Sequence, residues 1–215
     1  MIHKFPEQLA RRKVIDEKFF REIDNWVNLY LKGKTTYRKI AIEIPKIYSR
    51  CTEGVKEEKV KKEAKKFVDF YLKLYIQPYT RKLVRLMKTY GMTIGISGSP
   101  IEVVNLVGKK FDFDITYGSE LEVKDGIYTG RIKHNMIIKE TKEKALAKLV
   151  EEKKIELNKS FGFGDTEQDL SFLSQVRVPV ALNPNSMLLK VAIRNNWLVF
   201  TSKDDVAKSI KKLLK

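Results

Sequence analysis

Residues 161–170 read FGFGDTEQDL, a stretch that indicates a buried strand ending in a loop with two carboxylates. Its first four residues are small or apolar, as in a strand covered on both faces. Asp165 follows directly, and Asp169 comes four residues later, on the first turn of a predicted helix. In parallel α/β sheets, ligands bind outside the carboxyl ends of the strands. The two aspartates are therefore candidates for a ligand site.

The segments that flank this stretch alternate between strand and helix patterns. The predicted strands are 92–97, 113–118, 160–165, 178–182 and 197–200. The predicted helices are 99–111, 141–154, 167–176, 186–196 and 204–215. Residues 120–133 alternate in polarity around Asp125-Gly126, which is a strong hairpin signal. Strands that alternate with helices predict an α/β fold with a mostly parallel sheet covered on both faces.

The first ninety residues have the apolar spacing of helices instead. Helices are predicted at 16–34, 35–47, 55–75 and 80–91. Thr35 or Thr36 is the expected N-cap of the second helix. Pro45 is expected to kink or end that helix.

The strand at 92–97 ends in Ser97, the first serine of the sequence ISGSP. Gly98 lets the backbone turn tightly and approach a ligand closely. Ser99 is expected to cap the next helix, with Pro100 at the first helical position. A hydroxyl beside the free N–H groups of a helix start forms an anion site. The alternative is an ordinary strand–turn–helix connection with a serine cap.

Asp165 and Asp169 suit magnesium, because Mg²⁺ prefers hard oxygen ligands and is commonly held by one or two carboxylates plus phosphate. The alternative is a helix N-terminal charge at Asp169 and a turn residue at Asp165. Lys142 and Lys144 lie at the start of a predicted helix. The helix dipole disfavours a cation there, so a lysine at this place suggests that it binds an anion. In a lysine-rich chain, either lysine alone carries little weight.

The order of these features resembles the haloacid dehalogenase (HAD) superfamily, specifically its phosphoserine-phosphatase-like branch. A strand-end serine is followed by a helix-start lysine and then by strand-Gly-Asp-x-x-x-Asp. The sequences ISGSP, DGIYTG, FGFGDTEQDLSFL, ALNPN and NNWLVF are also similar, and the resemblance covers residues 80–215 nearly continuously.

The resemblance implies a Rossmann-like core, a Mg²⁺ cofactor and hydrolysis of phosphate esters through an aspartyl-phosphate. By position, Ser97 would bind the transferring phosphoryl group, and Gly98 would offer it a backbone N–H. Lys142 would neutralise the phosphate and the nucleophile. It is preferred to Lys144 because the apolar spacing of the following residues then matches the family.

The resemblance also assigns the two aspartates. Asp165 would ligate Mg²⁺, and Asp169 would hold the metal's water shell or Lys142. Lys142 and Asp169 are thus the expected catalytic side chains of this chain. The expected substrate is a small phosphorylated metabolite, with phosphoserine, phospholipids and sugar phosphates all left open.

The family's nucleophile lies on an apolar strand ending in Asp-x-Asp-x-Thr, ahead of all these features. No such strand precedes residue 92, because Asp16 and Asp24 lie in helical patterns. Residues 1–78 are therefore expected to form a helical cap region and residues 79–215 the Rossmann-like core, with the first core strand missing upstream. The chain is then expected to be an N-terminally truncated hydrolase that is inactive as given. The alternative is a catalytically inactive, phosphate-binding or regulatory relative.

The composition adds a basic nucleic-acid-binding protein as a further alternative. The 215 residues carry a formal net charge of +16, and the lysine-rich helices at 55–75 and 203–215 would be the binding surface. Most lysines alternate with glutamates, as in KEEKVKKEAKK at 56–66, so a solvated face with internal ion pairs is favoured and nucleic acid is not expected. No apolar run approaches the roughly 20 residues of a membrane span. The single cysteine, Cys51, excludes an internal disulfide framework, so a cytoplasmic protein of unknown oligomeric state is expected.

Overall fold

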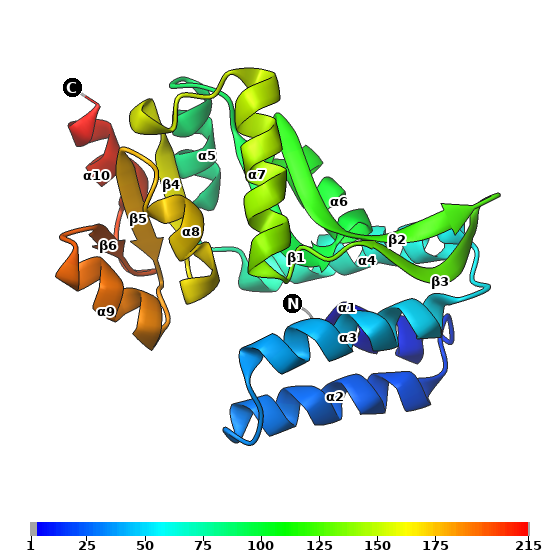
Figure 1. Cartoon of the computed structure of the whole chain (residues 1–215). Helices are drawn as coiled ribbons and strands as arrows, with labels where there is room; N and C mark the ends of the chain where they lie inside the picture. Colours follow the sequence, from blue (N-terminus) through cyan, green and yellow to red (C-terminus); the bar gives the residue numbers. More distant parts are fainter. Residues whose placement is uncertain (1–3, 215) are drawn as a thin grey trace. The chain divides into compact units, whose positions relative to one another are not determined.

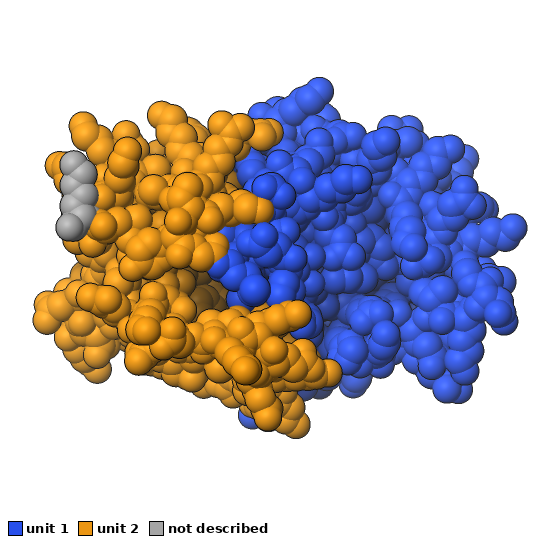
Figure 2. Space-filling model, turned by 90° about the horizontal axis from the view of Figure 1, so that it is seen from above, with its two compact units in different colours: residues 1–76, 92–138 blue, residues 77–91, 139–215 orange. Residues whose placement is uncertain are grey.

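The computed structural model describes residues 4–214. The chain forms two compact units, one made of the chain up to Ile76 with Met92–Ile138, the other of Gln77–Gly91 with the chain from Lys139 (Figures 1 and 2). Each unit contains one three-stranded sheet. These units do not coincide with the expected division after residue 78. The expected roles of residues 1–78 as a cap region and of residues 79–215 as the core stay a prediction.

Four helices begin the first unit: α1 (Lys4–Arg11), α2 (Glu17–Leu31), α3 (Tyr37–Thr52) and α4 (Glu57–Tyr75). The side chains of Asp16 and Thr36 cap α2 and α3 by accepting hydrogen bonds from main-chain N–H groups of the first turn. The sequence predicted the last three of these helices, whereas α1 was not expected. Buried Phe5 and Leu9 of α1 join Phe67 of α4 in one apolar core.

Helix α3 passes through Pro45 and continues to Thr52, rather than ending near residue 47 as expected. Proline has no N–H, so the carbonyl of Ala41 loses its usual partner within the helix. The side chain of Asn135 replaces that partner, because its Nδ2 donates a hydrogen bond of 2.9 Å to the Ala41 oxygen. A residue 94 positions away in the sequence therefore satisfies the carbonyl that Pro45 leaves open.

The sheet of the first unit has the order β1 (Ile94–Pro100), β2 (Ile115–Lys124) and β3 (Ile127–His134). β1 and β2 are parallel and are connected by α6 (Ile101–Phe111). β2 and β3 form the predicted hairpin. Asp125 and Gly126 have φ angles of 50° and 74° in its turn, which is the conformation that a two-residue type I′ turn requires.

The second unit contains a fully parallel sheet with the order β4 (Phe161–Gly164), β5 (Val178–Leu182) and β6 (Leu198–Phe200). Its α-helices are α5 (Thr80–Lys88), α7 (Lys139–Lys153), α8 (Leu170–Leu173), α9 (Ser186–Arg194) and α10 (Val206–Leu213). Short 3₁₀ turns at Leu157–Lys159 and Glu167–Asp169 precede β4 and α8. Every strand overlaps its predicted position.

Alternating side chains give this parallel sheet two apolar faces. On one face, Val180 of β5 packs with Leu83 of α5 and Ile210 of α10. On the other face, Ala181 of β5 packs with Leu188 of α9. Burial of both faces is typical of parallel sheets. The carboxyl ends of these strands are therefore held in place from two sides.

The predicted α/β class, with parallel strands flanked by helices, is confirmed. The strands are divided between two sheets, and no strand within residues 4–214 pairs with the outer edge of β1 or of β4. No helix in the described part of the chain is long and apolar enough to cross a bilayer.

Candidate functional site

Three predicted site residues come together at the carboxyl end of β4. Asp165 directly follows the strand, Asp169 ends the next 3₁₀ turn, and Lys142 lies in the first turn of α7. Lys142 Nζ is 3.2 Å from Asp169 Oδ1, and the two side chains are only 14% and 11% exposed. Lys144 is exposed. Of the two candidate lysines, Lys142 is thus the one that contacts the aspartate cluster.

Hydrogen bonds to both of its carboxylate oxygens hold Asp169 in place. Oδ2 accepts from the N–H groups of Asp165 at 3.2 Å and of Thr166 at 3.3 Å, while Oδ1 accepts from Lys142. Asp169 and Thr166 together form a capping box. The helix predicted at 167–176 is replaced by this 3₁₀ turn and the four residues of α8. Asp169 therefore orients Lys142 and the loop after β4 at the same time.

Asp165 lies in surroundings that disfavour its negative charge. Burial raises the pKa of this carboxyl, and the Asp169 carboxylate raises it further, whereas Lys142 lowers it. The pKa of Asp165 stays above its ordinary value, so an additional cation beside it would stabilise the ionised form. The main chain is fixed as well, because the Asp165 carbonyl accepts a hydrogen bond of 2.9 Å from the Asn185 N–H.

The oxygen donors at this edge fit a magnesium ion. Mg²⁺ prefers carboxylate and phosphate oxygens, and Asp165 offers such a group in a place where negative charge is in excess. Within residues 4–214, no group of three His, Cys, Asp or Glu side chains could hold a metal ion. An ion here would therefore complete its coordination with water and phosphate oxygens, as Mg²⁺ commonly does.

Two further residues of this edge were missed from the sequence. Thr166 forms the capping box, and its spacing to Asp169 is the usual three residues of that motif. Asn185 caps α9 by accepting a 2.9 Å hydrogen bond from the Leu188 N–H, and its Nδ2 donates to Glu167 Oε2. Asn185 thereby ties the loop after β5 to the loop after β4. An asparagine directly before the predicted helix at 186–196 was the available signal.

The predicted phosphate-binding residues Ser97 and Gly98 lie in the first unit, whereas the cluster around Asp165 lies in the second. The predicted N-cap role of Ser99 is wrong, because Pro100 occupies the N-cap position of α6 and no side chain caps that helix. Ser97 Oγ instead accepts a hydrogen bond of 3.2 Å from the N–H of Ser99. β1 therefore continues past Ser97, since this local bond keeps the segment extended up to the proline.

Gly98 has a packing role within the first unit. A Cβ at this position would lie 2.9 Å from Ile137 Cγ1, closer than real Cβ contacts allow. The Gly98 carbonyl accepts a 2.9 Å hydrogen bond from Ser119 Oγ, which in turn accepts one from the Met136 N–H at 3.1 Å. Close packing accounts for the glycine, and phosphate binding by its N–H stays a prediction.

The letters Asp-x-Asp-x-Thr do occur downstream of residue 92, as DFDIT at 112–116. These residues lie at the amino end of β2, where Asp112 ends α6 with a φ of 60°. Asp114 Oδ2 accepts hydrogen bonds of 2.8 Å from both the N–H and the hydroxyl of Thr93. These bonds attach the α6–β2 connection to Thr93, just before β1. Ligands bind at the carboxyl ends of parallel strands, so Asp112 and Asp114 at the amino end of β2 are not candidate nucleophiles.

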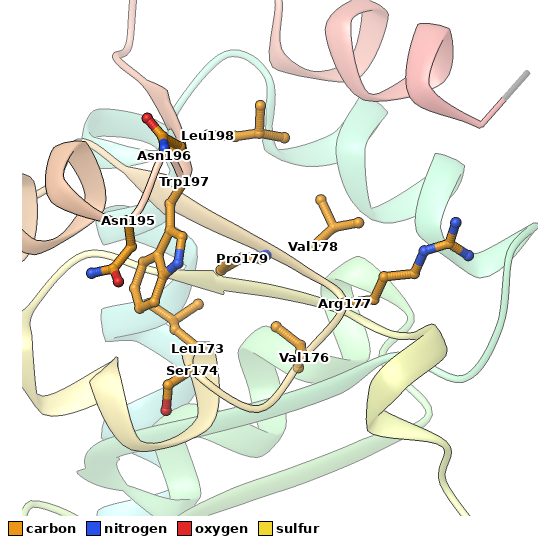
Figure 3. A pocket seen from close by; sticks show the side chains of 10 residues that line it. All are labelled: Leu173, Ser174, Val176, Arg177, Val178, Pro179, Asn195, Asn196, Trp197 and Leu198. Atoms are coloured by element: carbon orange, nitrogen blue, oxygen red, sulfur yellow. The ribbon is translucent and has the colours of Figure 1, made fainter.

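A pocket of about 380 Å³ lies at the amino ends of β5 and β6 (Figure 3). It is lined by residues 173–174, 176–179 and 195–198. The Trp197 indole lies near Asn195, whereas the Arg177 side chain points away from the indole (Figure 3). None of the predicted site residues lines this pocket. It is therefore separate from the cluster at the carboxyl end of β4.

Comparisons with known sequences agree on one family. The family model described as haloacid dehalogenase-like hydrolase matches residues 5–174. A histidinol-phosphatase of Neisseria meningitidis serogroup C (strain 8013) is 26% identical over 221 residues, which cover 94% of this chain and 91% of the relative. Phosphoserine phosphatase SerB2 of Mycobacterium tuberculosis is 26% identical over 120 residues. That match covers 55% of this chain and only 29% of the mycobacterial protein.

Solved structures share the fold. A protein with unknown function from Bordetella pertussis Tohama I has a TM-score of 0.74 at 19% identity, over 94% of this chain and 91% of that chain. A phosphoserine phosphatase solved as a phospho-aspartyl intermediate analogue has a TM-score of 0.66 at 18% identity, over 98% of this chain and 90% of that chain. At such identities the likeness concerns the fold alone.

Proposed function

Because the chain belongs to the haloacid dehalogenase-like hydrolase family, we propose that it acts on small phosphate monoesters with Mg²⁺ as cofactor. The predicted membership of this superfamily, in its phosphoserine-phosphatase-like branch, is confirmed. One observation carries the proposal: Lys142, Asp165 and Asp169 form a charged cluster at the carboxyl end of β4, in which Lys142 and Asp169 are largely buried and Asp165 is exposed to solvent. Ligands of parallel α/β sheets bind at such an edge.

The proposed chemistry relies on charge neutralisation. Phosphoryl transfer needs positioning and stabilisation of charge on the phosphoryl oxygens more than covalent help from side chains. Lys142 supplies a positive charge, and Asp169 holds its ammonium group in one orientation. A bound Mg²⁺ would supply further charge neutralisation at the phosphate. Asp165 would hold the metal, and phosphate binding by Ser97 and Gly98 of the first unit stays a prediction of its own.

A second candidate function is binding of phosphate and Mg²⁺ without turnover. The observation that favours it is the hydrogen bonding of Asp169, whose two oxygens already accept bonds from Lys142 and from the loop N–H groups. A carboxylate held in this way is a poor nucleophile. Asp165 is proposed as the metal ligand, so neither aspartate of the cluster is assigned to attack phosphorus. This candidate keeps the binding roles and removes the hydrolytic step.

The substrate class is proposed from the relatives. One relative is named a histidinol-phosphatase and others are named phosphoserine phosphatases. Both names denote enzymes that act on phosphate esters of small amino-acid-like molecules, and we propose that this chain acts on substrates of this class. Release of inorganic phosphate from phosphoserine, histidinol phosphate and a sugar phosphate, measured with the full chain, compares them directly.

Metal binding tests the site without depending on turnover. We expect Mg²⁺ to raise the melting temperature of the protein, and we expect Asp165→Ala to abolish that shift, because the variant loses the proposed metal ligand. Asp24→Ala is the matched control, since it removes an aspartate from α2 in the first unit. If Mg²⁺ raised the melting temperature of Asp165→Ala as much as that of the unmodified protein, the assignment of Asp165 as the metal ligand would be wrong.

Turnover separates the two candidate functions. If the chain hydrolyses phosphate esters, Lys142→Ala is expected to lower kcat/KM by at least about 100-fold, because it removes a preorganised charge beside the phosphate. Lys144→Ala is the control, since that lysine is exposed. A chain that shows the Mg²⁺ shift and binds phosphate but releases none would support the binding function. Equal loss in both lysine variants would contradict the assignment of Lys142.

A further inference from the structure

The helices of the second unit differ in how far acidic residues offset their cations. α5 reads TRKLVRLMK and α10 reads VAKSIKKL, with four and three cations and no acidic residue. The lysine-rich helix α4 of the first unit is different, because its sequence EEKVKKEAKKFVDFYLKLY carries six cations and four acids. Lysine content alone therefore does not distinguish a helix whose cations are partly offset by acids from a helix that has no acids.

Ion pairs offset part of the positive charge of α4, although its exposed lysines Lys59, Lys62 and Lys65 form none within the described residues. In α4, Lys61 pairs with Glu57 at 2.8 Å and Lys66 pairs with Glu63 at 2.6 Å. In the second unit, six exposed cations on α5, α10 and the loop before α10 form no ion pair with any residue of the described chain. They are Lys82, Arg85, Lys203, Lys208, Lys211 and Lys212.

The neighbouring acids form no ion pair with these cations. Asp204 accepts hydrogen bonds from the N–H and the hydroxyl of Thr201. Asp205 caps α10 and accepts from the main-chain N–H of Lys208 at 3.2 Å. Both carboxylates thus accept hydrogen bonds from groups at the start of α10 and in the loop before it. The outer side of the helix keeps its positive charge.

Tertiary packing brings the two basic helices together. α5 and α10 contact each other and cover the same face of the parallel sheet (Figure 1). Leu83 of α5 and Val206 and Ile210 of α10 are buried against that face. The cations therefore stand on the outer sides of both helices and form one surface, the α5–α10 surface.

We propose that the α5–α10 surface binds the phosphate backbone of a nucleic acid duplex. Exposed cations without carboxylate partners attract a polyanion and release its counterions. Membrane binding by an amphipathic helix needs an apolar face that is free to insert between lipids. The apolar faces of α5 and α10 are used by the protein core, which favours a purely electrostatic partner. Binding without base contacts is independent of sequence.

Salt dependence of binding to a labelled 20-base-pair DNA duplex, followed by fluorescence anisotropy, tests the proposal. The logarithm of the binding constant falls with the logarithm of salt concentration by about 0.9 per neutralised phosphate. We expect a slope of about −3 to −5, as three to five of the six cations would contact phosphates at once. The triple variant Lys208→Ala/Lys211→Ala/Lys212→Ala is expected to reduce the slope by about 2 to 3.

The matched control is Lys59→Ala/Lys62→Ala/Lys65→Ala, which removes the same net charge from exposed positions of α4. We expect this control to keep the slope of the unmodified protein. Equal losses in both triple variants would mean that net charge alone drives binding, and would overturn the proposal. If the α10 variant failed to fold by circular dichroism, Lys82→Ala/Arg85→Ala on α5 would take its place.

Binding to anionic vesicles of phosphatidylserine and phosphatidylcholine is the second part of the test. We expect weaker binding to these vesicles than to the duplex at the same salt concentration. Tighter vesicle binding that the α10 variant abolishes would overturn the nucleic-acid assignment in favour of a membrane. Absence of salt-dependent duplex binding by the unmodified protein would overturn the proposal outright.

Discussion

At the scale of single residues, the first unit contains two buried tyrosines with opposite hydrogen-bonding states. Tyr128 Oη donates a hydrogen bond of 2.5 Å to Glu102 Oε1. Tyr48 Oη is buried and has no hydrogen-bond partner within residues 4–214. Burial raises the pKa of Glu102, and the hydrogen bond from Tyr128 partly offsets that rise. Removal of the two hydroxyls is therefore expected to change stability in opposite directions.

Tyr128→Phe is expected to lower the free energy of unfolding by about 1–3 kcal/mol at pH 7, because it leaves a buried carboxylate without its donor. The pKa of Glu102 is raised by folding. Its stabilising contribution is therefore full below the unfolded-state pKa, near 4.5, and is lost as the pH rises. The loss caused by Tyr128→Phe should thus be smaller at pH 4 than at pH 7. Urea unfolding at both pH values measures it, and equal losses would contradict the role of the ionised carboxylate.

Tyr48→Phe is the matched variant in the same core. It removes a buried hydroxyl that has no partner, so we expect the free energy of unfolding to rise by about 1 kcal/mol. The same urea titration measures this change. A loss of stability would show that the hydroxyl is satisfied in solution, for instance by a buried water.

At the scale of secondary structure elements, α3 depends on a side chain from outside the helix. Asn135 Nδ2 bonds to the Ala41 carbonyl that Pro45 leaves without a donor. Asn135→Ala is expected to cost about 1–3 kcal/mol of unfolding free energy, because the buried carbonyl then has no partner. In a Pro45→Ala background the restored N–H can serve that carbonyl, so the cost of Asn135→Ala should fall. A double-mutant cycle measures the coupling.

The cycle has a clear contrary outcome. Asn135 Oδ1 also accepts a hydrogen bond from the Ile137 N–H at 3.1 Å, and this contribution is independent of Pro45. If Asn135→Ala cost the same with and without Pro45, the residue would act only through Ile137. The proline would then be tolerated for another reason.

At the scale of the whole molecule, the net charge of +16 favours unfolding through self-repulsion. Salt screens this repulsion within a Debye length of roughly 10 Å at 0.1 M. Salt also weakens exposed ion pairs, but such pairs contribute little each. We expect an increase from 20 to 300 mM NaCl to raise the melting temperature by a few degrees. Sodium chloride is suitable because phosphate and sulfate would also bind at the proposed site.

The α10 triple-lysine variant provides the control for this prediction. It lowers the net charge without touching the buried face of the helix, so its melting temperature should rise less with salt. A melting temperature that falls with added NaCl would show that ion pairs, and not net repulsion, dominate the electrostatics of folding.

The sequence by itself determined most local elements of this protein. The strands overlap their predicted positions because an apolar run bounded by turn residues has few alternatives. Asp125-Gly126 predicted its hairpin because positive φ is needed at both turn positions. Asp165 and Asp169 were expected at a strand end, and they lie there. These features depend on residues that are close together in the chain.

Only the tertiary structure decided the features that join distant residues. The contact of Lys142 with Asp169 spans 27 positions, and the rescue of α3 by Asn135 spans 94. The α5–α10 surface likewise exists because two helices far apart in the chain pack on one face of a sheet. Local patterns do not specify such contacts, since each depends on how the apolar faces of all elements are buried together.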